Sequence, residues 1–410
     1  MNRAAHRARA TSTQRGPATA AAVAAVATGL WLAAGCASRD IVASAAGEPA
    51  AHCATDAPVI LLGGPSRAGR ARAAVCTGSV AVRAFSHALC TCEGYAASTG
   101  LTTDSFDSTT GPYAPGGTTG DVAINGDLRS NALLTVGGGL VVAAATGAAL
   151  LADLHVAHDL AIAGPIGTGV TVTAGGNARI AGNIDLAALS VAGTLTVPPG
   201  ATLAGTVTAG ATQRAAVSIA PPCACGDTDI VDVPGLVAAH AIDNQDAAIG
   251  LVPDRFTDYH GAAVLDLPCG IYYLGPVRGD GELTLRITGR VALLIDGDIA
   301  LRAPLTITLD TDDAELDLIA RGILSSDQAI VIGRADHPAR TRIYLAGAGT
   351  TELSGNSQLA ANLYAPNTAI ALSATASIHG SLFVRRLDQS APLAIHYDID
   401  VRRADIACPP

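Results

Sequence analysis

Apolar residues recur every six positions in a Gly-rich stretch of the chain. The series includes Val122, Leu128, Leu134 and Leu140, returns at Leu154 and Leu160, and returns again near Ile184, Leu189 and Leu195. Turn sequences such as Asn125-Gly126-Asp127 and Gly182-Asn183 separate these positions, because tight turns need residues that tolerate positive φ. Very short strands at a fixed period predict a β-helix with about three strands per coil, in which each coil buries its inward residues on the next.

The composition favours the same fold. The chain has 410 residues, of which 49% are hydrophobic and only 3% aromatic. A compact core draws much of its energy from large aromatic side chains, whereas a long, thin core of Val, Ile, Leu and Ala does not. Apolar residues alternate with others within each short segment, which is typical of strands with one buried face. A β-sandwich is the alternative, but it would need longer strands with turns every 8–12 residues or so. We therefore predict an all-β solenoid.

The strand pattern is interrupted once, so the solenoid is expected in two stretches. The predicted regions are a signal peptide (1–35), a flexible tether (36–52), a Cys-rich head (53–101), a first solenoid stretch (102–222), an insertion (223–262), a second stretch (263–400) and a tail (401–410). Within the insertion, Asp232 can cap a short helix that Pro234 opens. The head and the tail are candidates to cap the end coils, whose strand edges would otherwise be free to pair.

The leader predicts export and a lipid anchor. Arginines occupy its first part, an apolar run spans 18–34, and Leu32-Ala33-Ala34-Gly35 precedes Cys36. This resembles the bacterial lipobox, which implies that Cys36 is acylated after cleavage; an ordinary signal peptide is the alternative. Ala37-Ser38 follows, without Asp in second place. By resemblance to lipoprotein sorting in enteric bacteria, this implies the outer membrane, with the protein facing the periplasm or the cell surface.

Eight cysteines remain if Cys36 is acylated. They are Cys53, Cys76, Cys90, Cys92, Cys223, Cys225, Cys269 and Cys408. An even number in an exported chain predicts disulfides, although the pairing is left open. Two C-x-C pairs, Cys90/Cys92 and Cys223/Cys225, also supply four thiolates, so a metal site is the alternative. We expect disulfides, because structural zinc sites favour wider spacing and the compartment is oxidising.

The segment 359–398 carries the most specific resemblance. Its Leu-Tyr-Ala-Pro-Asn, Gly-Ser-Leu-Phe and His-Tyr-Asp sequences resemble a C-terminal β-solenoid domain of unknown function, found in bacterial surface proteins that include pilus-associated proteins of the PilX type. The GDV, GDL and GGL repeats of the first stretch are weakly similar to bactofilins. The resemblance implies a β-solenoid at the cell surface and transfers no catalytic residue.

Acidic pairs are the main candidates for chemistry. Polysaccharide-cleaving β-helix enzymes place carboxylates along one face. The spacing of Asp296/Asp298 and of Asp398/Asp400 would place each pair on one face of a strand. Asp310, Asp312 and Asp313 are weak candidates for binding Ca²⁺, which favours several oxygen ligands. The simpler interpretation is that these acids solvate turns and edges.

Histidines and tyrosines add no matched catalytic set. His260 and His379 each precede a glycine, and a turn or edge position is expected for both. Tyr272, Tyr273 and Tyr364 are expected to pack on the core or an edge, with a sugar-stacking platform as the alternative. We identify no catalytic residue, cofactor-binding motif or nucleotide-binding loop.

The net charge of −10 argues against nucleic acid as a partner. We expect a non-enzymatic, lipid-anchored envelope protein with a structural, adhesive or assembly role. Its partners would be the membrane and an envelope protein, a pilus protein or a polysaccharide. The alternative is a carbohydrate-active β-helix enzyme acting on extracellular or cell-wall polysaccharide.

Overall fold

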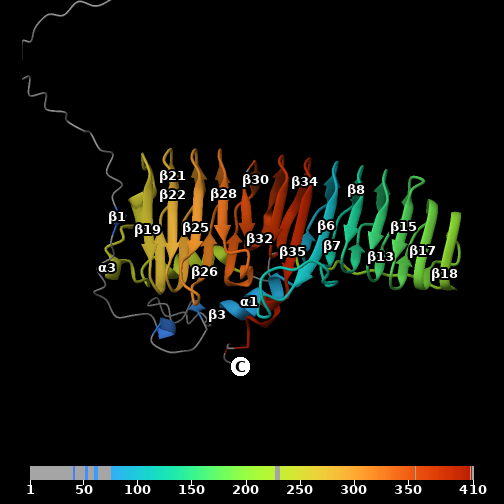
Figure 1. Ribbon diagram of the computed structural model, residues 1–410, viewed down its shortest axis with the longest axis horizontal. Helices are drawn as coiled ribbons and strands as arrows, with labels where there is room; N and C mark the ends of the chain where they lie inside the picture. The colour runs from blue at the N-terminus through green and yellow to red at the C-terminus, as the bar shows by residue number, and fades with distance from the viewer. Residues whose placement is uncertain are drawn as a thin grey trace, which may run out of the picture. The chain divides into compact units, whose positions relative to one another are not determined.

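The computed structural model describes residues 40–41, 51–53, 60–62, 75–226, 231–355, 357–406 and 408. The predicted signal peptide, Cys36 and most of the tether lie outside these residues. The described chain forms a parallel β-solenoid with three strand-bearing faces, which confirms the predicted all-β fold (Figure 1). Leu154 pairs with Val172 and Leu160 with Ala178, so a coil of 18 residues contains three of the six-residue repeats.

Each face is a ladder of parallel strands. Face 1 contains β20 (Gly270–Leu274), β23 (Arg290–Ile295), β26 (Glu315–Ala320), β29 (Thr341–Leu345), β32 (Asn362–Leu372), β34 (Leu382–Gln389), β4 (Leu89–Thr91), β7 (Val122–Ile124), β10 (Leu140–Val142), β13 (Leu160–Ile162) and β16 (Ala178–Ile180). Face 2 contains β21 (Val277–Gly279), β24 (Ile299–Leu301), β27 (Leu324–Ser326), β30 (Gly349–Leu353), the second parts of β32 and β34, β5 (Tyr95–Ala97), β8 (Leu128–Ser130), β11 (Ala148–Leu150) and β14 (Ile166–Gly167).

Face 3 contains β19 (Ala263–Leu267), β22 (Leu283–Ile287), β25 (Leu305–Leu309), β28 (Ile330–Gly333), β31 (Gln358–Ala360), β33 (Ala376–His379), β35 (Leu393–Asp398), β6 (Leu101–Phe106), β9 (Leu134–Val136), β12 (Leu154–Val156) and β15 (Thr171–Ala174). The long strands β17 (Ile184–Val197) and β18 (Leu203–Arg214) bend through all three faces and end the stack.

The two stretches meet in the middle of the stack. The last coil of the second stretch pairs with the first coil of the first stretch: Leu393 of β35 is in register with Leu101 of β6, and Leu382 of β34 with Leu89 of β4. Figure 1 shows β34 and β35 beside β6. We call this contact the junction. From it, the first stretch extends to β18 at one end, and the second stretch extends back to β19 at the other.

Three of the predictions about the organisation of the chain need correction. The solenoid begins at Leu89, not at 102. The prediction missed the first coil of the first stretch because two of its inward positions hold Thr91 and Ala97, which weakens the apolar period. The head and the tail do not cap the ends: α1 (Thr77–Ala84) packs on η4 (Ile399–Arg403) beside the junction. Asp40 and Ile41, placed in the predicted tether, form strand β1 and pair with β19.

Face 1 of the second stretch is buried on both sides. Outward-facing residues such as Leu294, Ile319 and Tyr344 are at most 1% exposed. The helix α2 (Val233–His240) packs on β20, β23 and β26. At the start of α2, the Asp232 side chain accepts a hydrogen bond from Gly235 N–H, so Asp232 caps the helix as predicted. Strands that are buried on both faces have continuous apolar sequences, and this explains the sequence VALLI in β23.

Smaller elements complete the described chain. They are η1 (Ala51–Cys53), the antiparallel pair β2 (Leu61–Leu62) and β3 (Val75–Cys76), α3 (Asp246–Ile249), η2 (Pro253–Phe256) and η3 (Pro338–Arg340). Among the described residues, none of the helices has the length and apolar character needed to cross a bilayer.

Candidate functional site at the junction

A row of polar side chains crosses the junction on face 3. Strand register places His379 of β33 beside His396 of β35, and His396 beside Asp104 of β6. These residues come from both ends of the solenoid sequence, yet they lie on three adjacent strands. Asp104 is the common acceptor: its Oδ1 lies 2.7 Å from Nδ1 of His396, and its Oδ2 accepts from the Tyr113 hydroxyl at 2.6 Å.

Tyr113 lies over the row from the segment between β6 and β7. Its ring centroid is 4.0 Å from that of His396 and 5.4 Å from that of His379. Phe106 packs edge-on against both Tyr113 and His379. The four residues Asp104, Tyr113, His379 and His396 form what we call the junction cluster. It is only partly accessible to solvent, since the side chains of His396 and Asp104 are 13% and 15% exposed.

Burial and the neighbouring carboxylate set the protonation of the cluster. Burial, and then the hydrogen bond to Asp104, raise the pKa of Tyr113 well above its usual range. Desolvation, and then the proximity of His396, lower the pKa of His379. His379 Nδ1 has no hydrogen-bond partner among the described residues. At neutral pH the phenol is therefore a donor to Asp104 rather than a base, and His379 is neutral.

The sequence did not single out most of this cluster. His379 was considered alone, and His396 entered only through the His-Tyr-Asp resemblance. Asp104 and Tyr113 carried no signal. Asp104 and His396 lie 292 positions apart in the chain, and only the pairing of β35 with β6 brings the two halves of the cluster together.

A hollow lies on face 2 near the same junction. Its volume is about 550 Å³, and its charged lining residues are Glu93, Asp127, Arg129 and Arg386. Arg129 pairs with Asp127 at 2.6 Å, and Arg386 pairs with Asp388. The hollow is therefore polar and carries charges of both signs.

The predicted acid pairs are not catalytic pairs on strand faces. Asp398 ends β35 and is fully buried, where it accepts from the backbone N–H groups of Ser108, Ala339 and Asp400. Asp400 lies in η4, because the strand has already ended. The Asp398 carboxylate therefore ties three segments together at the junction.

Asp296 and Asp298 lie in the turn after β23 rather than on a strand. Asp296 accepts from the Tyr273 hydroxyl at 3.0 Å and from Arg321 at 2.5 Å. Asp298 accepts from Ile323 N–H and pairs with Arg278. Gly297 between them has a φ of +152°, so the local backbone is a turn and the two carboxylates join different neighbours in the next coil.

The calcium candidates occupy the loop between β25 and β26. Asp312 pairs with Arg334 at 3.2 Å, while Asp310 and Asp313 are exposed. Within the described ranges, the one group that brings three metal-binding atoms within 4.8 Å of one another is His52, Cys53 and Cys269, and its two cysteines are joined by a disulfide.

The remaining candidates have packing or surface roles. His260 is exposed and lies 3.0 Å from Asp280. Tyr272 is buried, and Tyr364 stacks near Phe383 with ring centroids 4.9 Å apart. Tyr273 is half-buried and bonded to Asp296. These positions favour packing over a sugar-stacking platform.

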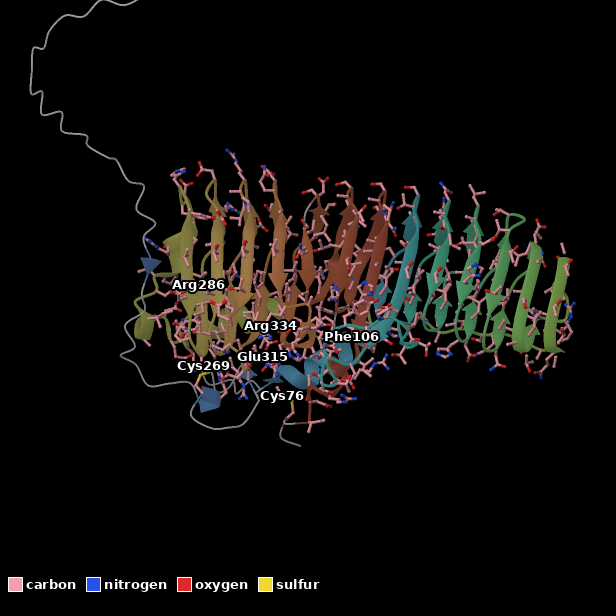
Figure 2. All side chains as sticks on the ribbon, in the orientation of Figure 1. Cys76, Phe106, Cys269, Arg286, Glu315 and Arg334 are labelled. Carbon is pink, nitrogen blue, oxygen red and sulfur yellow. A yellow bond between two sulfur atoms is a disulfide. The ribbon has the colours of Figure 1, made fainter. Side chains whose placement is uncertain are left out.

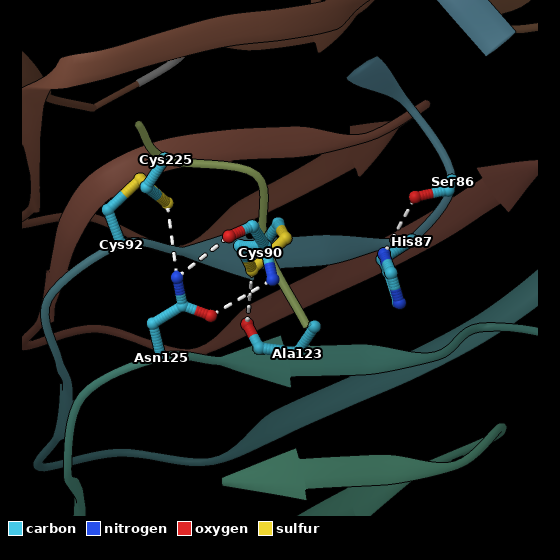
Figure 3. The surroundings of a disulfide bond; sticks show 8 residues. Ser86, His87, Cys90, Cys92, Ala123, Asn125 and Cys225 are labelled. Carbon is cyan, nitrogen blue, oxygen red and sulfur yellow. Dashed lines mark hydrogen bonds between the residues drawn. A yellow bond between two sulfur atoms is a disulfide. The ribbon is translucent and has the colours of Figure 1, made fainter. Parts of the chain in front are cut away.

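The eight cysteines form four disulfides. The pairs are Cys53–Cys269, Cys76–Cys408, Cys90–Cys223 and Cys92–Cys225. Cys76 and Cys269 lie along the same side of the solenoid (Figure 2). Each cysteine of one C-x-C pair is bonded to a cysteine of the other, which fixes the segment returning from β18 onto β4. Asn125 holds this segment as well, since its side chain donates to Cys223 O and accepts from Cys223 N–H (Figure 3).

The second stretch matches a known family. Residues 233–404 match the family described as a domain of unknown function, DUF7305. The match begins at the first residue of α2 and ends just after η4, so it includes the helix with the strands that the helix covers. No curated protein and no solved structure matches the chain.

Proposed function

We propose that the chain is an exported, lipid-anchored protein of the bacterial outer membrane with a structural, adhesive or assembly role and no enzymatic activity. The observation that carries the proposal is the set of four disulfides. Disulfides persist in oxidising compartments outside the cytosol, in agreement with the leader and Cys36. The similarity of 359–398 to domains of surface and pilus-associated proteins supports the same location.

A rigid spacer fits the arrangement of the described strands. Cys36 and Asp40 of β1 are four positions apart, so their Cα atoms are at most about 14 Å apart when the chain is extended. An anchor at Cys36 would therefore stay close to the β19 end. The thirteen strands of face 3, spaced by about 4.8 Å, make a stack about 60 Å long. With its axis normal to the membrane, such a stack would hold the β18 end about that far from the surface.

The anchor and the compartment are tested by intact mass. The protein is purified from its own membranes and measured with and without reduction, beside a Cys36→Ser variant. We expect a chain that begins at an acylated Cys36 and gains eight hydrogens on reduction, and an unacylated variant. A wild-type chain without lipid, or with free thiols, would contradict the proposal.

The adhesive role is tested at the junction cluster. We expect Tyr113→Ala to weaken binding to envelope polysaccharide or to isolated envelope fragments, because it removes the half-buried aromatic ring that lies over His396. Ser190→Ala, an exposed position on face 3 four strands away from β6, is the control. Equal binding by both variants and wild type would exclude the cluster as the adhesive surface, and turnover of cell-wall or capsular polysaccharide by the purified protein would contradict the non-enzymatic role.

A further inference from the structure

The two ends of the solenoid differ, and we infer from this difference that the β18 end binds the β18 end of a second copy of the chain. The inference rests on backbone hydrogen bonds and on the sequence of β18. It does not depend on the lipid anchor or on the proposed role in the envelope.

The β19 end is closed on all three faces. On face 3, Asp40 and Ile41 pair with Val264 and Leu265. On face 1, Gln245 N–H donates to Ile271 O, and the side chains of Gln245 and Asp246 accept from Ile271 N–H and Tyr273 N–H.

On face 2, the segment around η2 completes the closure. Gly275 N–H donates to Pro253 O, Tyr259 N–H donates to Arg278 O, and Asp280 N–H donates to Tyr259 O. The backbone groups at the outer edge of the coil formed by β19, β20 and β21 are thus hydrogen-bonded to residues that lie outside the coils. Further strands cannot pair with β20 or β21 without displacing these residues, and on face 3 the described chain leaves only the two-residue strand β1 at the edge.

The β18 end has no such cover in the part of the chain that the structure describes. Strand β18 pairs with β17 alone, and its residues are exposed or half-exposed (Figure 1). Inward-facing residues direct their N–H groups toward the next coil in this direction: Leu160 donates to Asn177 O and Ile184 to Thr202 O. The equivalent positions of β18 therefore present unpaired N–H and C=O groups at the end of the stack. These positions are Leu203, Val207, Ala209, Thr212 and Arg214.

The sequence of this edge lacks two of the usual protections against pairing, charge and proline, although its ladder to β17 has two register shifts. Edge strands are normally blunted by charges, proline or bulges that twist them away. Residues 199–213 contain no charged residue, and no proline lies within β18. The one charge of β18 is Arg214, which folds back and donates to Pro198 O and Ala201 O of its own coil. An uncharged edge brings no like-charge repulsion when it meets itself.

A second copy fits this edge through a two-fold axis. Segment 206–209 lies at the centre of β18, with 203–204 before it and 211–214 after it. An antiparallel contact centred on Thr208 sets Thr208 opposite Thr208 of the second copy and Val207 opposite Ala209, and it brings each flank to the opposite flank of that copy. This is a self-complementary contact of the kind that closes a dimer. Growth beyond two copies is blocked because the β19 ends are closed.

The test places like charges across the axis. The full chain is purified in detergent without reduction, and its mass is measured by sedimentation equilibrium over a range of concentrations. Thr208→Asp sets two carboxylates near each other across the axis, and directly opposed like charges destabilise strand pairs. Thr135→Asp, in the same outward row on β9, is the matched control.

We expect dimers for wild type and Thr135→Asp, and at least a tenfold weaker dimer for Thr208→Asp, with the same circular dichroism for all three. Thr206→Asp replaces Thr208→Asp should that variant fail to fold. A monomeric wild type at about 100 μM, or a dimer that resists both β18 substitutions, would overturn the inference. Species larger than dimers would overturn the closure at β19.

Discussion

The same arginine–aspartate pair occurs twice between neighbouring coils, once buried and once at the surface. Arg342 of β29 holds Asp317 of β26 through Nε at 2.7 Å and Nη2 at 2.9 Å, and both side chains are at most 3% exposed. Arg286 of β22 holds Asp266 of β19 with the same two-atom geometry, but those side chains are 42% and 29% exposed. Because geometry and register match, the two pairs differ mainly in burial and in the second carboxylate, Glu315, that contacts Arg342.

We predict that Asp317→Ala lowers the free energy of unfolding by about 3–5 kcal/mol, because it leaves a buried guanidinium without its main partner. Asp266→Ala should cost less than about 1 kcal/mol, since water replaces the partner of an exposed arginine. Chemical denaturation of both variants measures the difference. Equal losses would mean that Glu315, 2.6 Å from Arg342, compensates fully for Asp317.

Asp246 makes the closed end sensitive to pH. It is 5% exposed, and burial raises its pKa to about 6, although the hydrogen bond from Tyr273 N–H opposes that rise. Its other oxygen has no partner among the described residues. Between the ordinary pKa of 3.8 and about 6, the unfolded chain has lost this proton while the folded chain keeps it. Asp246 therefore reduces stability as pH rises through this window, and its contribution is constant above it.

The comparison of wild type with Asp246→Asn tests this assignment, since asparagine does not titrate. We expect the stability of wild type relative to the variant to fall by about 2–3 kcal/mol between pH 4 and pH 7. Unfolding measured at a series of pH values gives the difference directly and removes the contributions of all other groups. A difference that does not change with pH would show that the carboxylate is already ionised at pH 4.

At the scale of elements, the contact between α1 and η4 depends on a glycine. A Cβ atom at Gly78 would lie 1.9 Å from the carbonyl oxygen of Ala404, so the helix touches the turn backbone to backbone. The Cys76–Cys408 disulfide fixes the same two segments. Together they hold the head against the end of the last coil.

Alanine at Gly78 should therefore destabilise the protein by about 1–3 kcal/mol, as overpacking does, although alanine favours an isolated helix. Gly200→Ala is the control, because a Cβ there meets nothing within 4 Å. Thermal unfolding of the two variants measures the contrast. A neutral or stabilising Gly78→Ala would mean that α1 and η4 separate readily.

The elements also show what the sequence could and could not predict. The six-residue period predicted the coils of the first stretch, and Asp232 with Pro234 predicted α2. The first coil was missed because Leu89-Cys90-Thr91 and Tyr95-Ala96-Ala97 contain few large apolar residues. The spacing of Asp296 and Asp298 predicts a strand, because spacing alone does not show that Gly297 turns the chain. The junction cluster depends on pairings between distant strands, for which a single sequence has no local signal.

For the whole molecule, the unequal ends predict unequal fraying. Coils contact mainly their neighbours in a solenoid, so opening begins at an end that lacks a cap. At a protein concentration low enough to leave β18 free, hydrogen exchange should be fastest in β18, slower in β17 and slowest near the junction. Strands β19 and β20 should exchange more slowly than β18, because residues 245–259 and β1 close that end. Equal exchange at both ends would contradict the role of this closure.

The junction also has a consequence for the order in which the protein is made. Ribosomes release the chain from its N-terminus, so the coil at 89–106 emerges long before its neighbour at 382–398. Until then, one side of that first coil faces water with an unpaired edge, and any early stop leaves it so. Folding that waits for such distant contacts is slow and exposes the chain to aggregation. Because Cys408 lies beyond the last coil, its bond to Cys76 can form only after every coil has been delivered, which makes that bond a chemical mark of a completed solenoid.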